Sequence, residues 1–172
     1  MKYDKNQAHY VTATVILVKD GKYLIAKRAG WEKAFPNKWT VPGGKLEVLD
    51  YALREKDTGS HWYNVVEDLC KKEVKEEVGL EFKNLEYVTS LVYVRSDNMP
   101  SLIISLWAEP VDKTPQIVLG KSLTEYQWVT LEEAKNYDLI EGIYEELEML
   151  DKKLKTGKGI GEWKKNEGFQ SY

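Results

Sequence analysis

The chain has 172 residues, of which 42% are hydrophobic and 31% charged, proportions typical of a single globular domain. Its net charge is −3, and acidic and basic residues are mixed along the sequence, which argues against a nucleic-acid backbone as the main partner. Cys70 is the one cysteine, so an intramolecular disulfide is excluded and a cytoplasmic protein is expected; the polar start and short apolar runs predict neither a signal peptide nor a membrane span.

The sequence of the first 45 residues indicates mainly β-strands. Tyr10–Val18 is an apolar, β-branched run typical of a buried strand, and Asp20-Gly21 after it favours a two-residue hairpin turn. A second strand is predicted over Tyr23–Arg28. After an irregular segment, we predict a short strand from Trp39 that ends in a tight loop at Gly43-Gly44.

The middle of the chain predicts an inserted loop followed by a helix. Val48–Tyr63 has mixed polarity and contains a turn cluster, so we predict a loop with a helical turn over Tyr51–Lys56. Asn64, with Glu67 three residues later, resembles a capping box. Apolar residues then recur at three- and four-residue steps as far as Gly79, which is typical of an amphipathic helix with a glycine C-cap.

The last third predicts further strands and a terminal helix. The strands are Leu85–Val94, Ser101–Trp107 and Tyr126–Val129. Thr130 and Glu133 repeat the capping-box pattern, and helix is predicted, with one or two interruptions, to about Lys155. Its apolar stripe fits either the second face of the sheet or a homodimer contact. We therefore predict one domain over residues 1–155 and a tail over residues 156–172.

Three glutamates gather on one face of the predicted central helix. Glu73, Glu76 and Glu77 stand at i, i+3 and i+4, within a single turn. Their mutual repulsion favours a bound cation, and Mg²⁺ prefers oxygen ligands of this kind. The alternative is a solvated helix face on which neighbouring lysines offset the acids.

With Pro42-Gly43-Gly44 upstream, this segment resembles the box of the Nudix hydrolase family, G-x5-E-x7-R-E-U-x-E-E-x-G-U, where U is a bulky aliphatic residue. Gly44 matches the first glycine of the box, and Glu73 to Leu80 match its end in register. The resemblance covers roughly residues 9–150. It implies an α/β fold, a Nudix-type α/β/α sandwich with a mixed β-sheet.

The chain departs from the family's box in three ways. Gly44 and Lys72 are 28 positions apart where the box has 14, so about 14 residues are inserted. Lys72 stands at the box arginine, and counting back eight positions from it gives Asn64 where the box has glutamate. Lysine is not a bidentate substitute for arginine. We therefore hypothesise that the inserted loop and an Asn64 cap replace the salt bridge thought to orient the family's catalytic helix.

The resemblance implies a hydrolase that cleaves a phosphoanhydride bond of a nucleoside di- or triphosphate derivative, NDP-X to NMP plus P-X, with divalent metal. Glu73, Glu76, Glu77 and the carbonyl of Gly44 would hold Mg²⁺ or Mn²⁺, which neutralises phosphate charge and activates water. Arg28, at a strand end, is expected to contact phosphate. The partner is thus a small nucleotide-type substrate, with no nucleic acid and no membrane.

The resemblance leaves several roles open. The water's proton would go to Glu76, Glu77 or a later acid, for which Glu125 is the first candidate and Glu109 the second. Three aromatic residues before the box could border a base, namely Trp31, Phe35 and Trp39. The main alternative function is a catalytically silent Nudix domain that binds a nucleotide or a protein. A third hypothesis is an interaction protein with a merely solvated acidic helix.

Overall fold

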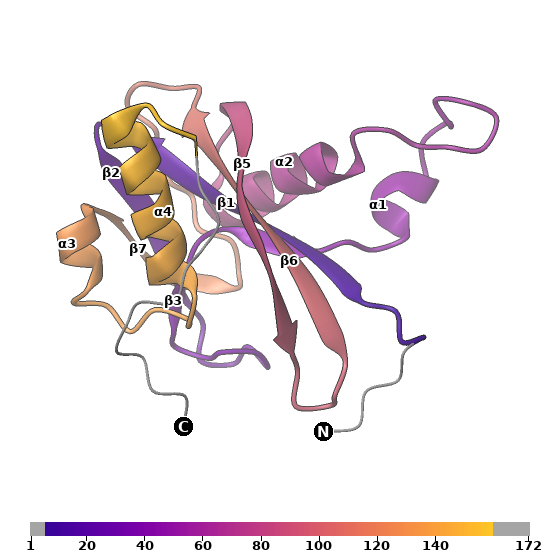
Figure 1. The fold of residues 1–172 in the computed structure, drawn as a ribbon, viewed down its shortest axis with the longest axis horizontal. Coiled ribbons are helices and arrows are strands. Elements are labelled where there is room, and N and C mark those ends of the chain that lie inside the picture. The colour runs from indigo at the N-terminus through magenta and orange to yellow at the C-terminus, as the bar shows by residue number, and fades with distance from the viewer. Residues whose placement is uncertain (1–5, 160–172) are drawn as a thin grey trace.

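Seven strands and four helices make up residues 6–159, the part of the chain that the structure, a computed structural model, describes (Figure 1). The strands are β1 (Tyr10–Lys19), β2 (Lys22–Arg28), β3 (Trp39–Thr40), β4 (Gly43–Lys45), β5 (Phe82–Val94), β6 (Pro100–Pro110) and β7 (Leu123–Val129). The helices are α1 (Leu49–Ala52), α2 (Val65–Val78), α3 (Leu131–Ala134) and α4 (Ile143–Thr156). The strands form one mixed sheet, so the predicted α/β fold is confirmed.

The strand β1 pairs with one strand at its beginning and with another at its end, and the candidate site lies where these two partners separate. Its beginning pairs with β4, its end pairs with β2 through the predicted Asp20-Gly21 turn, and its other edge pairs with β6 in parallel. Both turn residues have positive φ, 50° and 71°, as the predicted hairpin requires. The sheet therefore opens between β2 and β4, near Gly43.

The prediction of a tight loop at Gly43-Gly44 is wrong, because both residues belong to β4. Among the described residues, the glycines with positive φ lie elsewhere, so these two are not needed for a turn. A Cβ on Gly43 would lie 2.4 Å from the carbonyl oxygen of Ala13. Glycine is required here because the backbone of β4 approaches β1 too closely for a side chain.

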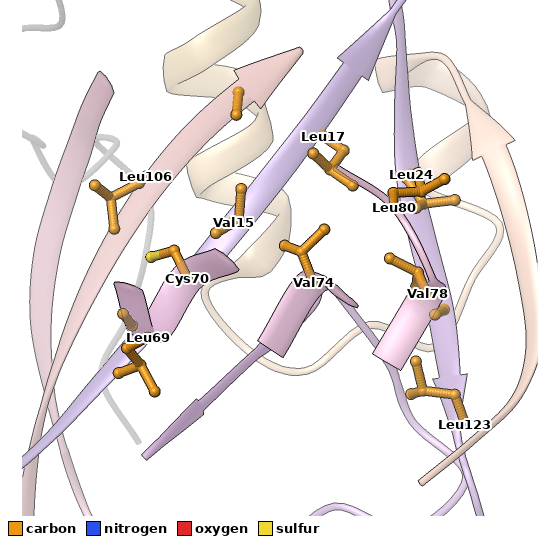
Figure 2. Packing of buried hydrophobic residues seen from close by; sticks show 13 residues of the cluster. Val15, Leu17, Leu24, Leu69, Cys70, Val74, Val78, Leu80, Leu106 and Leu123 are labelled. Atoms are coloured by element: carbon orange, nitrogen blue, oxygen red, sulfur yellow. The ribbon is translucent and has the colours of Figure 1, made fainter. Parts of the chain in front are cut away.

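Two apolar cores cover the two faces of the sheet. Alternate residues of β1 point to opposite faces, so Val15 and Leu17 pack under α2, while Ile16 and Val18 pack under α4. Figure 2 shows the first core, in which the predicted apolar stripe of α2 meets β1 and β2. α4 covers the other face, so its apolar stripe packs on the sheet, the first of the two predicted alternatives.

The ends of α2 confirm one predicted cap and contradict the other. Gly79 ends the helix with φ +74°, and its N–H donates to the carbonyl of Lys75. Asn64 precedes the helix with φ +56° and makes no side-chain cap hydrogen bond, so the predicted capping box with Glu67 is wrong. An N-cap side chain reaches the first turn from extended backbone, and a left-handed residue does not have that geometry.

Most remaining predictions hold with shifted bounds. The helical turn predicted over Tyr51–Lys56 overlaps α1 in two residues, because α1 begins at Leu49 and ends at Ala52. β5, β6 and β7 are all longer than predicted. Thr130 and Glu133 form the predicted capping box of α3. No helix within residues 6–159 is long and apolar enough to cross a membrane. Most of the predicted tail, residues 156–172, lies outside the described part of the chain.

Glu146 of α4 is a buried acid in the second core, with 5% of its surface exposed. Its Oε2 accepts a hydrogen bond of 2.6 Å from the Ser105 hydroxyl on β6. Burial raises the pKa of Glu146 from 4.5 to about 7, although this hydrogen bond favours the charged form. The stability of the fold should therefore depend on the protonation of this one group.

We expect Glu146→Gln to remove that dependence. Because the pKa is higher in the folded chain, its contribution is complete below pH 4.5 and is lost as the pH rises through about 7. Over that window the loss is on the order of 3 kcal/mol. Urea unfolding across the pH range measures it, with the exposed Glu148→Gln as control. Parallel curves for wild type and Glu146→Gln would contradict the prediction.

Candidate active site

The acidic face of α2 meets β4 at Glu77, which is 8% exposed. The backbone N–H of Gly43 donates to its Oε2 at 3.0 Å, and the Ser122 hydroxyl donates to its Oε1 at 3.1 Å. Burial nevertheless raises the pKa of Glu77 to about 6, against the effect of these hydrogen bonds and of the Arg28 charge. Glu77 is thus a fixed, partly desolvated carboxylate that a nearby cation would stabilise.

Glu73 lies one turn earlier on the same helix face, against Gly44. A Cβ on Gly44 would come within 2.3–2.5 Å of the Glu73 carboxyl group. The Oε1 of Glu73 lies 3.3 Å from Nζ of Lys72, and burial raises the pKa of Glu73. Glu76 is exposed beside them. The fold therefore brings Glu73 and Glu77 to β4 and leaves Glu76 at the solvent edge.

The donor set fits a hard divalent cation in its chemistry, since it consists of carboxylate and carbonyl oxygens. Within residues 6–159, however, no three His, Cys, Asp or Glu side chains are already arranged around a metal position. Glu77 is turned to Gly43 and Ser122, and Glu73 is turned to Lys72. Binding at all three glutamates would therefore require side-chain rotations that exchange these contacts for the ion.

The two glycines of β4 make a matched pair for a test. Gly43→Ala should destabilise the fold by roughly 2 kcal/mol, because its Cβ meets the backbone of Ala13 and Thr14. Gly44→Ala meets only the end of the flexible Glu73 side chain, so stability should change less while hydrolysis falls. Thermal unfolding and turnover of both variants separate the two effects. Equal losses of stability would show that Glu73 cannot move.

A salt bridge links α1 to the acidic face of α2. Nζ of Lys72 donates to Oδ1 of Asp50 at 2.9 Å, and Oδ2 of Asp50 accepts the N–H of Glu47 at 2.7 Å. Burial opposes ionisation of Asp50, but these contacts lower its pKa, and the same pair raises the pKa of Lys72. The hypothesis that Asn64 and the insertion replace a salt bridge is therefore wrong.

The register explains the error. Counting six positions forward from Gly44 reaches Asp50, the place of the box glutamate, whereas counting back from Lys72 reaches Asn64. The inserted residues thus follow Asp50. They form the loop between α1 and the N-terminal end of α2 (Figure 1). Within this loop, Arg54 donates a hydrogen bond of 2.7 Å to Asp57 and another to the carbonyl of Tyr63. Residues of the insertion thus hydrogen-bond to one another, and the salt bridge between Asp50 and Lys72 is kept.

Arg28, at the end of β2, lies near Glu77, and its phosphate contact stays a prediction. Its Nε donates to the carbonyl of Ala34 at 2.8 Å, and its Nη2 donates to Glu32 at 3.0 Å. Its charge also lowers the pKa of Glu77, although burial of Glu77 has the larger, opposite effect. Arg28 is thus held in place as a positive charge close to the acidic helix face.

The two later acids lie apart from the glutamates. Glu125 belongs to β7 rather than to a loop, and it bonds Nζ of Lys27 at 2.7 Å. Lys27 and Arg28 are consecutive in a strand, so Glu125 is on the opposite face from Arg28. Glu109 accepts a hydrogen bond from Asn84 at 3.0 Å. Neither contact brings a later carboxylate to Glu77, whereas Ser122, which no sequence pattern indicated, does reach it.

The three aromatic residues before the box have different surroundings. Trp31 is 72% exposed, whereas Trp39 is buried and packs edge-on against Tyr137. Phe35 contacts Tyr93 of β5, with ring centroids 5.4 Å apart. Two surface hollows, of about 460 and 340 Å³, are lined by residues at the C-terminal end of α2 and around the α3–α4 connection, and neither includes a glutamate of the site.

Comparison with known proteins agrees with this geometry. The family model of the NUDIX domain matches residues 8–150. The nucleoside triphosphatase NudI of Klebsiella pneumoniae is 23% identical over 134 residues, covering 72% of this chain and 84% of that protein. NudI of Escherichia coli K12 is 23% identical over 132 residues, with the same coverage.

Solved structures show the same fold. A NUDIX hydrolase from Alicyclobacillus acidocaldarius, 13% identical, has a TM-score of 0.67 and covers 91% of this chain and 100% of its own. The NUDIX domain of Shewanella oneidensis NrtR, solved in complex with ADP ribose, is 16% identical with a TM-score of 0.66; the match covers 88% of this chain and 94% of that domain. At these identities the likeness concerns the fold alone.

Proposed function

Because the chain belongs to the NUDIX family, we propose that it is a metal-dependent hydrolase of a phosphoanhydride bond in a nucleoside di- or triphosphate derivative. The observation that carries this proposal is the placement of Glu73 and Glu77 against the glycines of β4. Three glutamates in one turn give a divalent cation oxygen ligands, and the family's hydrolases generally use such ions. The NudI relatives, named as nucleoside triphosphatases, support the nucleotide as substrate class.

In this proposal Glu73, Glu76 and Glu77, with the carbonyl of Gly44, hold Mg²⁺ or Mn²⁺. An ion bound there would neutralise the diphosphate and lower the pKa of the attacking water. Gly43 and Ser122 hold Glu77 beside β4, and its side chain would exchange these hydrogen bonds for the ion on binding. Arg28, fixed by Glu32 and Ala34, supplies positive charge to the phosphates. The products are a nucleoside monophosphate and the other phosphorylated fragment.

The main alternative is a catalytically silent domain, because Asn64 and Lys72 at the box positions would not form the salt bridge thought to orient the catalytic helix. Asp50 and Lys72 form that pair in this chain, at 2.9 Å. This chain therefore has aspartate and lysine where the family's box has glutamate and arginine, and the contact between the two positions is retained. The retained contact removes the main sequence argument for a silent domain, so hydrolysis is the function we advance.

The test uses the purified full chain with Mg²⁺ or Mn²⁺ and a panel of nucleoside triphosphates, nucleotide sugars, ADP-ribose and dinucleoside polyphosphates. Chromatography should show a nucleoside monophosphate that appears only with the metal and disappears when a chelator is added. The product pair identifies the bond that is cut. A folded chain that binds metal and forms no product with any compound would overturn the proposal.

A further inference from the structure

The connection between β6 and β7 lies against the last turn of α2, whose final carbonyls have no partner within the helix. The N–H of Val118 donates to the carbonyl of Val78 at 3.1 Å. The N–H of Gly120 donates to the carbonyl of Glu77 at 2.9 Å. A Cβ on Gly120 would lie 2.3 Å from the carbonyl oxygen of Glu76, so only glycine fits here. The backbone of this connection is therefore fixed directly beside the acidic face of α2.

Ser122, at the end of this connection, contacts both halves of the candidate site. Its hydroxyl donates to Oε1 of Glu77 at 3.1 Å, and its carbonyl accepts the N–H of Ala29 at 2.8 Å. Ala29 directly follows Arg28, and Arg28 pairs with Leu123 in the sheet. The backbone of Ser122 is thus anchored to the strand end that carries Arg28. A rotation of the Glu77 side chain would therefore leave the Ser122 hydroxyl behind.

Both carboxylate oxygens of Glu77 accept hydrogen bonds from the protein. Oε2 accepts from the N–H of Gly43 at 3.0 Å, and Oε1 accepts from the Ser122 hydroxyl. Because Glu77 is only 8% exposed, these two donors replace most of the water that would solvate a free carboxylate. A cation that draws Glu77 away from β4 would break both hydrogen bonds. Only one of them can be removed by substitution, since the Gly43 donor belongs to the backbone.

We propose that Ser122 is a positioning residue that holds Glu77 against β4 and competes with the divalent cation for it, and so sets the metal affinity of the site. The inference rests on the function proposed above for the identity of the ion. The hydrogen bond is present in the free chain and is given up on binding, so its strength is subtracted from the affinity. Removing the hydroxyl should therefore tighten metal binding. This determinant lies outside the sequence segment that resembles the family's box.

The test is metal binding by the full chain without nucleotide, so that it does not depend on turnover. Calorimetric titration with Mn²⁺ should give a Kd about tenfold lower for Ser122→Ala than for the wild type, the size expected for one hydrogen bond to a charged group. Ser122→Thr keeps the hydroxyl and should bind like the wild type, whereas Ser122→Val, of nearly the same shape, should bind like Ser122→Ala. The control Ser96→Ala, exposed between β5 and β6, should leave the Kd unchanged.

Thermal unfolding separates this role from a merely structural contact. Without metal, Ser122→Ala should unfold at a lower temperature than the wild type, because the buried carboxylate of Glu77 loses a donor. Saturating Mn²⁺ should remove the difference, because the tighter binding restores the stability that the free chain lost. A contact that only stabilises the fold would lower both transition temperatures equally and leave the Kd unchanged, which would overturn the inference.

The effect should disappear in a Glu77→Gln background, because Ser122 acts on the ion only through the Glu77 carboxylate. A lower Kd for Ser122→Ala in that background would overturn the inference. So would a raised or unchanged Kd in the otherwise wild-type chain, or no Mn²⁺ binding by either chain. Hydrolysis with a Kd that does not depend on Ser122 refutes this inference alone, whereas a Ser122-dependent Kd without hydrolysis refutes only the proposed function.

Discussion

Replacing Glu77 by glutamine is expected to lower kcat at least roughly a hundredfold, the range found when a positioned acid or base is lost from a catalytic site. Glutamine keeps the shape of the side chain and one carbonyl oxygen, so the N–H of Gly43 retains an acceptor. The variant loses the negative charge that would hold a divalent cation. Metal-dependent turnover of the best substrate from the panel measures the effect.

The same substitution should not destabilise the fold. Burial raises the pKa of Glu77 to about 6, so at neutral pH the folded chain holds a carboxylate that would be better solvated in the unfolded chain. The neutral glutamine avoids this cost, which is on the order of 2 kcal/mol. The Ser122 hydroxyl can accept from the new amide where it donated before. We expect thermal stability equal to or above that of the wild type.

Glu67→Gln is the matched control, because Glu67 is an exposed acid on the first turn of the same helix. It removes the same charge from α2 without touching β4. Turnover should stay close to that of the wild type. If Glu67→Gln and Glu77→Gln lost activity equally, the effect would come from the overall charge of the helix and the assigned role of Glu77 would be wrong.

Local patterns in the sequence were enough for the helix and its acidic face. The i, i+3 and i+4 spacing of Glu73, Glu76 and Glu77 is a property of any helix, and the apolar stripe that buries the other side is also periodic. Gly79 at the end follows from backbone conformation alone. These features depend on neighbours within one turn, so tertiary packing did not have to be known.

Contacts between distant segments could not be obtained in this way. Ser122 is 45 residues from Glu77, and nothing in its own surroundings marks it as a partner. The sequence predicts the last strand only from Tyr126, which leaves Glu125 outside it; in the structure Glu125 belongs to β7, and the two-residue period turns it to the other face. The closeness of β4 to β1, which requires Gly43, likewise exists only in the folded sheet.

The insertion produced the one error that affected function. Because of the insertion, the position of the box glutamate can be counted forward from Gly44 or back from Lys72. The two counts give the same residue only when the box has no insertion. Asp50 also differs from the expected glutamate, so residue type did not settle the choice. The hydrogen bond between Lys72 and Asp50 does settle it, because charge pairing is independent of where the additional residues lie in the chain.

Loss of the Asp50–Lys72 pair is expected to lower kcat by roughly 10–100-fold, the usual cost of removing a residue that orients a metal ligand. Lys72 also contacts Glu73, so Asp50 acts on the site through the lysine and the loop that carries Gly44. Asp50→Asn keeps the size of the side chain and can still accept from Glu47. It should therefore change kcat more than KM or thermal stability.

A double-mutant cycle distinguishes a positioning pair from two independent surface charges. If the residues act as a pair, Asp50→Asn combined with Lys72→Met should lose little more activity than either change alone. Asp57→Asn is the control, because it breaks the ion pair with Arg54 inside the insertion and removes no contact of Asp50 or Lys72. Additive losses in the double variant would contradict the pairing. Lys72→Arg, which restores the residue type of the family's box, should retain activity because arginine can still bond Asp50 across this distance.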